Sequence, residues 1–356
     1  MTLKTICTIV GARPQFIKAA PVSRALASSF REVFIHTGQH YDYGMSEVFF
    51  EEMEMRPPDF HLGVGGGTHG EQTGRMLIEI EKVLNSVKPD YVLVYGDTNS
   101  TLAGALAAAK AQIPLAHVEA GLRSYNRAMP EEVNRVLTDH VSSLLFCPTD
   151  AAVENLAKEG ITRGVHHVGD VMYDALLHNL VIARKHSTIL EALKLEKGSY
   201  ALATVHRAAN TDDPARLGAL LNALASLSTR VIFPVHPRTR NMIRELGFSL
   251  SENIVLIEPV GHFDILILQE NANCILTDSG GMQKEAFILG VRCITLREET
   301  EWVETVQAGW NTLTGVNRDA IRHAFETWHP SGERLAFYGN GQAARKICEI
   351  FSGKLA

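Results

Sequence analysis

Residues 91–120 read YVLVYGDTNSTLAGALAAAKAQIPLAHVEA, and this stretch decides the fold class. The apolar runs at 91–95 and 115–119 predict two buried strands, because each is short and is bounded by turn residues. The Ala-rich residues 100–111 between them have the length and composition of a helix. Strands that alternate with helices in this way predict a parallel sheet covered by helices, so we expect an α/β protein.

The same alternation continues on both sides of this stretch. Further apolar runs predict strands at 5–10, 32–37 and 144–147, and then at 200–205, 230–235, 254–258, 274–277 and 292–296. Two series of this kind predict two Rossmann-like, doubly wound domains that face a cleft. We place the first domain at 1–170, the second at 171–338, and a C-terminal helix at 339–356 that returns to the first domain.

Composition excludes several classes of protein. The 356 residues include 34 Lys and Arg against 40 Asp and Glu, and this net charge of −6 argues against a nucleic-acid-binding protein, which needs a basic face. No run of about 18 apolar residues predicts a membrane span. Five cysteines without a CxxC pair predict reduced thiols and no metal site. Since the N-terminus has no signal-peptide pattern, we expect a cytoplasmic protein.

The turn after the first predicted strand is a candidate anion site. It reads GARPQFIK at 11–18, in which Gly11 permits the turn and Pro14 suits the first helical position. A helix N-terminus presents free N–H groups, and Arg13 and Lys18 add two cations. The alternative is a capped helix with a surface arginine and a surface lysine.

Three acids of the first half lie near strand ends. Asp97 and Glu119 follow the strands at 91–95 and 115–119, and Glu131 begins a helix after Pro130. If they gather in one cleft, their mutual repulsion raises at least one pKa and permits acid–base chemistry. Spacing alone favours simpler interpretations, in which Asp97 caps a helix and Glu131 forms a solvated ion pair with Arg135, four residues on.

The second half carries a candidate phosphate turn. The strand at 274–277 leads into Asp278-Ser279-Gly280-Gly281, which offers a hydroxyl and free N–H groups at a helix start. Glu285 lies one turn into that helix, and His206 follows the strand at 200–205. A glycine-rich turn with an exposed Glu285 and a structural His206 is the alternative.

The run Gly65–Gly70 matches GxGxxG by its letters alone. It follows a single weak apolar stretch, and the dinucleotide fingerprint requires a clear strand directly before it. We therefore interpret this run as a loop and expect no nicotinamide cofactor.

These segments together resemble the non-hydrolysing UDP-N-acetylglucosamine 2-epimerase family. The resemblance rests on GARPQFIKAAP (11–21), TGQHYD (37–42), YGDTNSTLAG (95–104), HVEAGLRS (117–124), MPEEVNR (129–135), TVHR (204–207), PVHPRTR (234–240) and TDSGGMQKEA (277–286). Others are similar to the UDP-2,3-diacetamido-2,3-dideoxyglucuronate 2-epimerase branch, namely GGTHGEQTGRML (66–77), SYNRAMPEE (124–132), TDDPARL (211–217) and REETEWVET (297–305).

The resemblance implies a glycosyltransferase-B type of fold, with UDP held mainly by the C-terminal domain. It implies a catalytic set made of Asp97, Glu119, Glu131, Arg135 and His206. It implies a substrate-binding set made of Arg13, Lys18, His40, Ser279, Gly280, Gly281 and Glu285. It further implies a homodimer that acts on a UDP-sugar without metal or cofactor.

The chain departs from the family at three positions. Many members have Glu where this chain has Ala209, and others have Arg where it has Trp302. Ala208 replaces an arginine common in the branch that a second substrate molecule can activate.

The expected activity is therefore inversion of C2 in a UDP-2-acetamido sugar, from gluco to manno, by elimination and readdition of UDP. Either UDP-2,3-diacetamido-2,3-dideoxyglucuronate or UDP-N-acetylglucosamine fits as substrate, for synthesis of surface polysaccharide sugars. A hydrolysing epimerase or a glycosyltransferase of the same fold is the alternative.

Overall fold

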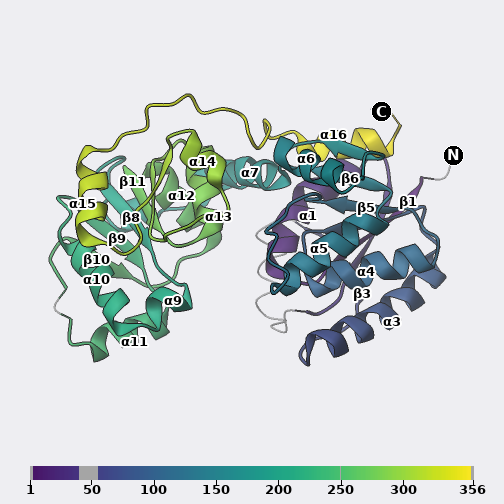
Figure 1. Ribbon diagram of the computed structural model, residues 1–356, viewed down its shortest axis with the longest axis horizontal. Coiled ribbons are helices and arrows are strands. Elements are labelled where there is room, and N and C mark those ends of the chain that lie inside the picture. Colours follow the sequence, from purple (N-terminus) through teal and green to yellow (C-terminus); the bar gives the residue numbers. More distant parts are fainter. Residues whose placement is uncertain (1–2, 40–54, 249, 354–356) are drawn as a thin grey trace. The chain divides into compact units, whose positions relative to one another are not determined.

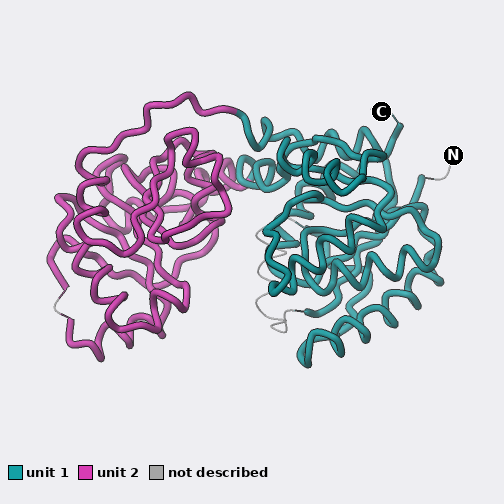
Figure 2. Tube along the Cα trace, viewed as in Figure 1, with its two compact units in different colours: residues 1–178, 336–356 teal, residues 179–335 magenta. Residues whose placement is uncertain are grey.

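A computed structural model of the chain describes residues 3–39, 55–248 and 250–353. The chain divides into two compact units (Figure 2). Unit 1 comprises Met1–His178 and Ala336–Ala356, and unit 2 comprises Asn179–Leu335. The division falls within one helix, α7 (Val171–His186). Within the described residues, none of the helices combines the length and the apolar character that crossing a bilayer demands.

Unit 1 is built on a seven-stranded sheet in the order β3-β2-β1-β4-β5-β6-β7, in which every pairing is parallel. Its strands are β1 (Thr5–Val10), β2 (Arg31–His36), β3 (Phe60–His61), β4 (Tyr91–Tyr95), β5 (Leu115–Val118), β6 (Leu144–Cys147) and β7 (Val165–His167). Its helices are α1 (Arg13–Leu26), α3 (His69–Val87), α4 (Asn99–Lys110), α5 (Pro130–Val141), α6 (Asp150–Lys158), the first half of α7 and α16 (Ala343–Phe351). Because β1 pairs with both β2 and β4, the chain order reverses beside β1.

Helices cover both faces of this sheet, which explains why its central strands are mostly apolar. Alternate residues of β1 point to opposite faces, so Ile6 packs with α1 and α16 while Cys7 packs with α3 and α4. Helices α3, α4 and α5 lie side by side (Figure 1). The loops after β1, β4 and β5 therefore emerge at one edge of the sheet, between two helical layers.

Unit 2 repeats the plan with six parallel strands in the order β10-β9-β8-β11-β12-β13. They are β8 (Tyr200–Thr204), β9 (Arg230–Pro234), β10 (Ile254–Ile257), β11 (Cys274–Thr277), β12 (Cys293–Thr295) and β13 (Asn311–Leu313). The helices are α8 (Ile189–Ala192), α9 (Ala208–Thr211), α10 (Pro214–Ala225), α11 (Pro237–Glu245), α12 (His262–Asn271), α13 (Gly280–Leu289), α14 (Val303–Gln307) and α15 (Arg318–Thr327). Helices α10 and α15 pack on one face, and α12 and α13 pack on the other.

The last helix belongs to unit 1. Ile347 and Phe351 of α16 lie in the apolar layer with α1. The carboxylate of Asp174 on α7 accepts hydrogen bonds from the N–H groups of Ala343 and Ala344 at 3.1 and 2.9 Å. These bonds satisfy N–H groups that a helix start leaves without an intrahelical partner.

The predicted α/β class, with two parallel sheets and interleaved helices, is confirmed. Three strands were not predicted, namely β3, β7 and β13. Each has only two or three residues, and both residues of β3 are exposed. Such short segments give no periodic signal. The described part of the chain contains all five cysteines, none in a disulfide, and no group of side chains there could hold a metal ion.

Gly11 is required by a close approach of the turn after β1 to its neighbours. A Cβ at this position would lie 2.0 Å from Thr37 Oγ1 and 2.2 Å from Ser100 Oγ, two hydroxyls that are themselves hydrogen-bonded at 2.8 Å. Overpacking of this kind forces the backbone or a side chain to shift.

We predict that Gly11→Ala destabilises unit 1 by roughly 1–3 kcal/mol. Gly74→Ala on α3 is the matched control, because a Cβ there meets nothing within 4 Å, and it should stabilise the protein by roughly 0.5–1 kcal/mol through reduced entropy of the unfolded chain. Calorimetric melting of both variants checks this, and equal melting temperatures would contradict it.

Candidate active site

Gln15 ties the turn after β1 to the end of β4. Its side-chain oxygen accepts from the N–H groups of Gly11 and Ala12 at 2.8 and 3.0 Å, and its amide nitrogen donates to the carbonyl of Tyr95 at 2.8 Å. The side chain is buried. Sequence reasoning missed this contact, because its two ends are eighty residues apart.

Asp97, the first of the predicted acids, is held by two side chains of α5. Arg135 donates a hydrogen bond to its carboxylate, and Asn134 donates to its backbone carbonyl at 2.9 Å. Spacing alone had favoured an ion pair between Arg135 and Glu131, and this interpretation is wrong. Arg135 pairs with Asp97 and Glu132, because its guanidinium reaches the β4 loop, whereas Glu131 lies on the exposed side of the first turn.

Lys18 and Glu119 form an ion pair at the ends of β1 and β5. Lys18 Nζ lies 2.5 Å from Glu119 Oε2, and both side chains are mostly buried. Burial alone would lower the pKa of the Lys18 ammonium, but the carboxylates of Glu119 and Asp97 raise it above its usual value. Lys18 therefore carries its charge beside two of the predicted acids.

The loops after β4 and β5 meet at this pair. Gly96, which precedes Asp97, is so close that a Cβ on it would lie 3.3 Å from Lys18 Nζ and 4.0 Å from Glu119 Oε1. Glu119 has φ of 72°, in the left-handed region that side chains other than glycine seldom adopt. Strained backbone of this kind is common at functional sites. The structure thus brings Asp97, Glu119, Lys18 and Arg135 together.

Two predicted residues of unit 1 lie at exposed helix starts. Arg13 is the first residue of α1, and Glu131 lies in the first turn of α5. Glu132, which sequence reasoning missed, is buried and accepts from the N–H groups of Ser124 and Tyr125 at 2.9 Å. Glu132 is therefore engaged with the loop before α5. His40 lies outside the described residues.

Arg123 is held by two carboxylates and is not available to a ligand. It donates two hydrogen bonds to Glu159 at 2.7 and 2.8 Å and one to Asp139 at 2.7 Å, and its side chain is 1% exposed. Burial alone would lower the pKa of its guanidinium, but hydrogen bonds to these two groups raise it.

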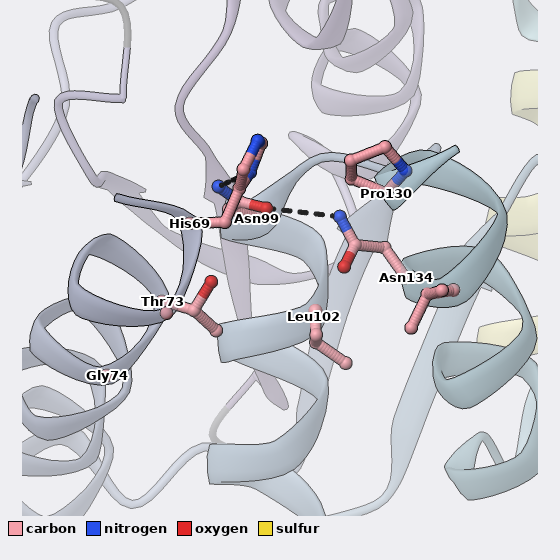
Figure 3. A pocket seen from close by; sticks show the side chains of 9 residues that line it. His69, Thr73, Gly74, Asn99, Leu102, Pro130 and Asn134 are labelled. Carbon is pink, nitrogen blue, oxygen red and sulfur yellow. Dashed lines mark hydrogen bonds between the residues drawn. The ribbon is translucent and has the colours of Figure 1, made fainter. Parts of the chain in front are cut away.

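A cavity of roughly 360 Å³ opens between α3, α4 and α5 (Figure 3). Its lining comprises His69, Gly70, Thr73, Gly74, Asn99, Leu102, Pro130, Val133 and Asn134. Asn99 bonds His69 at 3.1 Å and Asn134 at 3.2 Å, so amide groups form one wall while the remainder is largely apolar. Since Asn134 also bonds the carbonyl of Asp97, this wall touches the backbone of the predicted acid.

In unit 2, Asp278 joins the loops that follow β8 and β11. Its buried carboxylate accepts from the N–H groups of His206 and Arg207 and from the amide of Asn210 at 3.0 Å. The His206 side chain is 57% exposed, with Nδ1 at 3.5 Å from Asp278. His206 is therefore presented to solvent beside the turn at Ser279.

The predicted phosphate turn is the N-terminus of α13. Ser279 is the N-cap residue, and its Oγ accepts from the N–H of Met282 at 3.5 Å. The carboxylate of Glu301 packs against Gly280, where a Cβ would lie 1.9 Å from Glu301 Oε1, and Arg297 donates to that carboxylate at 2.9 Å. An anionic group thus lies next to a helix start, which favours negative charge.

Two more predicted site residues, Gly281 and Glu285, lie in this helix, and Trp302 lies beside it. Gly281, the second helical residue, is exposed. The ammonium of Lys284 lies 4.5 Å from the centroid of the Trp302 ring, so Trp302 acts as a packing and cation–π partner. Glu285 accepts a hydrogen bond from Gln269 at 2.8 Å. Burial raises the pKa of the Glu285 carboxyl, and Gln269 and Lys284 offset only part of that effect.

Unit 1 therefore offers carboxylates paired with cations, which can exchange protons with a bound molecule. Unit 2 offers a helix start with a hydroxyl, glycines and an exposed histidine, which can bind phosphate groups.

Comparisons with known proteins agree with one another. A model of the family described as UDP-N-acetylglucosamine 2-epimerase matches residues 24–352. A UDP-N-acetylglucosamine 2-epimerase homolog from Methanococcus maripaludis is 53% identical, over 97% of this chain and 98% of that protein. The UDP-2,3-diacetamido-2,3-dideoxy-D-glucuronate 2-epimerase of Pseudomonas aeruginosa is 49% identical, over 98% of this chain and 99% of that protein.

A solved structure gives the same result. The UDP-GlcNAc 2-epimerase of Methanocaldococcus jannaschii, in complex with UDP-GlcNAc and UDP, superposes with a TM-score of 0.81 at 45% identity. That alignment covers 99% of this chain and 100% of that one.

We predict that Glu285→Gln stabilises unit 2 at pH 7.5. Each kcal/mol gained in the free energy of unfolding should raise the melting temperature by roughly 2–4 °C. The raised pKa means that ionised Glu285 costs stability in the folded state. The gain should disappear as the pH falls to about 4.5, the usual pKa of glutamate, because the carboxyl is then neutral. Glu270→Gln, at an exposed ion pair with Arg184, is the control. A lower melting temperature for Glu285→Gln at pH 7.5 would contradict this prediction.

Proposed function

The chain belongs to the UDP-N-acetylglucosamine 2-epimerase family, and we propose that it inverts C2 of a UDP-linked 2-acetamido sugar without hydrolysing it. It is a UDP-sugar 2-epimerase, an isomerase. The observation that carries the finer proposal is the gathering of Asp97, Glu119, Lys18 and Arg135 at the ends of β1, β4 and β5.

The chemistry must remove a hydrogen that no neighbouring carbonyl acidifies. We propose that a base takes the C2 proton while the bond from C1 to the diphosphate oxygen breaks, and the electron pair of that bond leaves with UDP. The product is a 2-acetamidoglycal with a double bond between C1 and C2. A proton then returns to C2 on the opposite face while UDP adds back to C1, so that atoms and charge balance.

Unit 1 suits the proton transfers. Asp97, Glu119 and Glu131 are carboxylates at strand or helix ends, and two of them are paired with Arg135 and Lys18. A positioned carboxylate can accept a proton or return one. We propose that the base for one face and the acid for the other come from this set, with Arg135 positioning Asp97.

Unit 2 suits the leaving group. The departing diphosphate gains negative charge, which preorganised donors stabilise. We propose that Ser279, Gly280 and Gly281 bind it at the start of α13, with help from His206 and Arg13. Glu285 is proposed to accept a hydrogen bond from a ribose hydroxyl, and Lys18 and His40 to contact the sugar.

The diacetamido uronate is the substrate that we favour, with UDP-N-acetylglucosamine as the second candidate. Its C6 carboxylate needs a cation, and Arg123 does not meet this need because Asp139 and Glu159 already occupy it. Arg127 and Arg75 are the remaining candidates in the segments that resemble this branch, and both are exposed.

A biological role, an oligomeric state and a compartment complete the proposal. We propose that the enzyme supplies a manno-configured sugar nucleotide for surface polysaccharide, and that it acts as a homodimer. The cytoplasm is the compartment that we propose, because the five cysteines are unpaired and burial raises the pKa of the thiols of Cys7, Cys147 and Cys274 to about 12.

We predict that the protein converts UDP-2,3-diacetamido-2,3-dideoxyglucuronate and UDP-N-acetylglucosamine into mixtures of the gluco and manno epimers. NMR of the anomeric protons measures both rates, and we expect the uronate to react faster. Asp97→Asn and Glu131→Gln should abolish turnover while leaving UDP affinity unchanged, because both change proposed proton carriers of unit 1 whereas the diphosphate is proposed to bind unit 2. Free UDP with a free sugar would indicate a hydrolysing epimerase instead. Wild-type rates in both variants would contradict the assignment of the acids.

We also predict that the double variant Ser279→Ala and His206→Ala weakens UDP binding by roughly 10²- to 10⁴-fold, because two hydrogen bonds to a charged group together contribute about 3–6 kcal/mol. Ser226→Ala at the end of α10 is the control, since its hydroxyl only bonds the carbonyl of Ala223. Titration calorimetry with UDP measures both. Unchanged affinity in the double variant would contradict the placement of the diphosphate in unit 2.

A further inference from the structure

His117 is a fully buried side chain whose two ring nitrogens are both engaged. Nε2 lies 2.7 Å from the backbone carbonyl of Gly96, and Nδ1 lies 2.7 Å from the carboxylate Oδ1 of Asp139. The residue belongs to β5, two positions before Glu119. The motif at 117–124 contains His117, but the sequence alone assigned this residue no role of its own.

The partners of His117 hold its ring from two sides. A carbonyl oxygen only accepts hydrogen bonds, so Nε2 carries a hydrogen. Asp139 accepts from the N–H of Gly121 at 3.1 Å and from Arg123 at 2.7 Å. Burial works to raise the pKa of Asp139, but His117 and Arg123 outweigh it and hold that pKa below its usual value. The carboxylate of Asp139 thus faces Nδ1, while the carbonyl of Gly96 faces Nε2.

A buried polar side chain of this kind is stable only where its polar atoms have partners. Here His117 lies in a row of paired groups with Asp139, Arg123 and Glu159. Both ring nitrogens of His117 are engaged with oxygen atoms. His117 thus has no nitrogen with which to take a proton from a substrate, and it is not a base.

Its contacts instead join the three segments that carry the proposed chemistry. Gly96 is followed directly by Asp97, and His117 itself precedes Glu119 on β5. Asp139 lies on α5, one turn after Arg135, whose guanidinium bonds Asp97. One side chain therefore sets the spacing of the β4 loop, the β5 loop and α5.

We propose that His117 is a positioning residue for the proton transfers, which holds Asp97 and Glu119 in register with α5 through hydrogen bonds at both of its ring nitrogens. This inference rests on the proposed epimerase function. Misplacing the acids by a fraction of an ångström slows the return of the proton to C2 more than it weakens nucleotide binding. The glycal and UDP then have time to escape.

The test compares His117→Gln and Asp139→Asn with His140→Gln. The glutamine has one amide nitrogen and cannot donate to Gly96 and Asp139 on opposite sides of the ring. Asp139→Asn keeps the volume but replaces the carboxylate that faces Nδ1 with a neutral amide. His140 is the matched control, because it lies at the exposed margin of the same network, 3.2 Å from Glu159.

Three quantities are measured for each folded variant: kcat and KM for epimerisation, the fraction of turnovers that release glycal and UDP, and UDP affinity. We expect His117→Gln to lower kcat by roughly 100-fold, to raise the released fraction severalfold and to leave KM and UDP affinity within about twofold. Asp139→Asn should change kcat and release in the same direction, and His140→Gln should change neither.

A purely structural role gives a different result. Partial unfolding lowers the concentration of active enzyme, and therefore the apparent kcat, but it leaves the released fraction per turnover unchanged. That pattern, or a kcat for His117→Gln within threefold of the wild type, would overturn the proposal. If His117→Gln does not fold, an unchanged released fraction in Asp139→Asn overturns it as well. Failure of the epimerase function is separate, because the wild-type chain would then form no epimer.

Discussion

The contacts of α5 with the loops after β4 and β5 are the constraint on which the proposed site depends. Arg135 and Asn134 hold Asp97 from one end of this helix, and Asp139 holds His117 and Gly121 from the other. Parallel strands bring the loops to one edge of the sheet but do not set their spacing to a fraction of an ångström. Charge-assisted hydrogen bonds in a buried setting do so, because each unpaired partner would be costly.

Physical patterns in the sequence explain why the fold class was predictable. Central strands of a sheet covered on both faces are apolar throughout, and strands 91–95 and 274–277 coincide with β4 and β11. The helix at 100–111 was also recognisable from its Ala-rich composition, and it corresponds to α4. Strand β3 was not, because it has only two residues and both are exposed.

Local spacing in the sequence predicted the types of residue at the candidate site. It did not predict which side chains contact one another there. Asp97 and Glu119 were identifiable because they follow strands, and Ser279 because it precedes two glycines at a helix start. Lys18 was identifiable as a cation beside a helix start, but its ion pair with Glu119 was not predicted. Such contacts join positions that are far apart in the sequence, so no window of neighbouring residues reveals them. The strained backbone of Glu119 likewise depends on what surrounds it.

The central claim is that C2 loses its proton to solvent-exchangeable carboxylates of unit 1 while UDP departs and returns. The most direct measurement is to run the reaction in deuterium oxide and to follow C2 of both epimers by NMR and mass spectrometry. The account predicts one deuterium at C2 of the manno product, with total UDP-sugar conserved. A manno product that keeps its original C2 hydrogen would contradict the account.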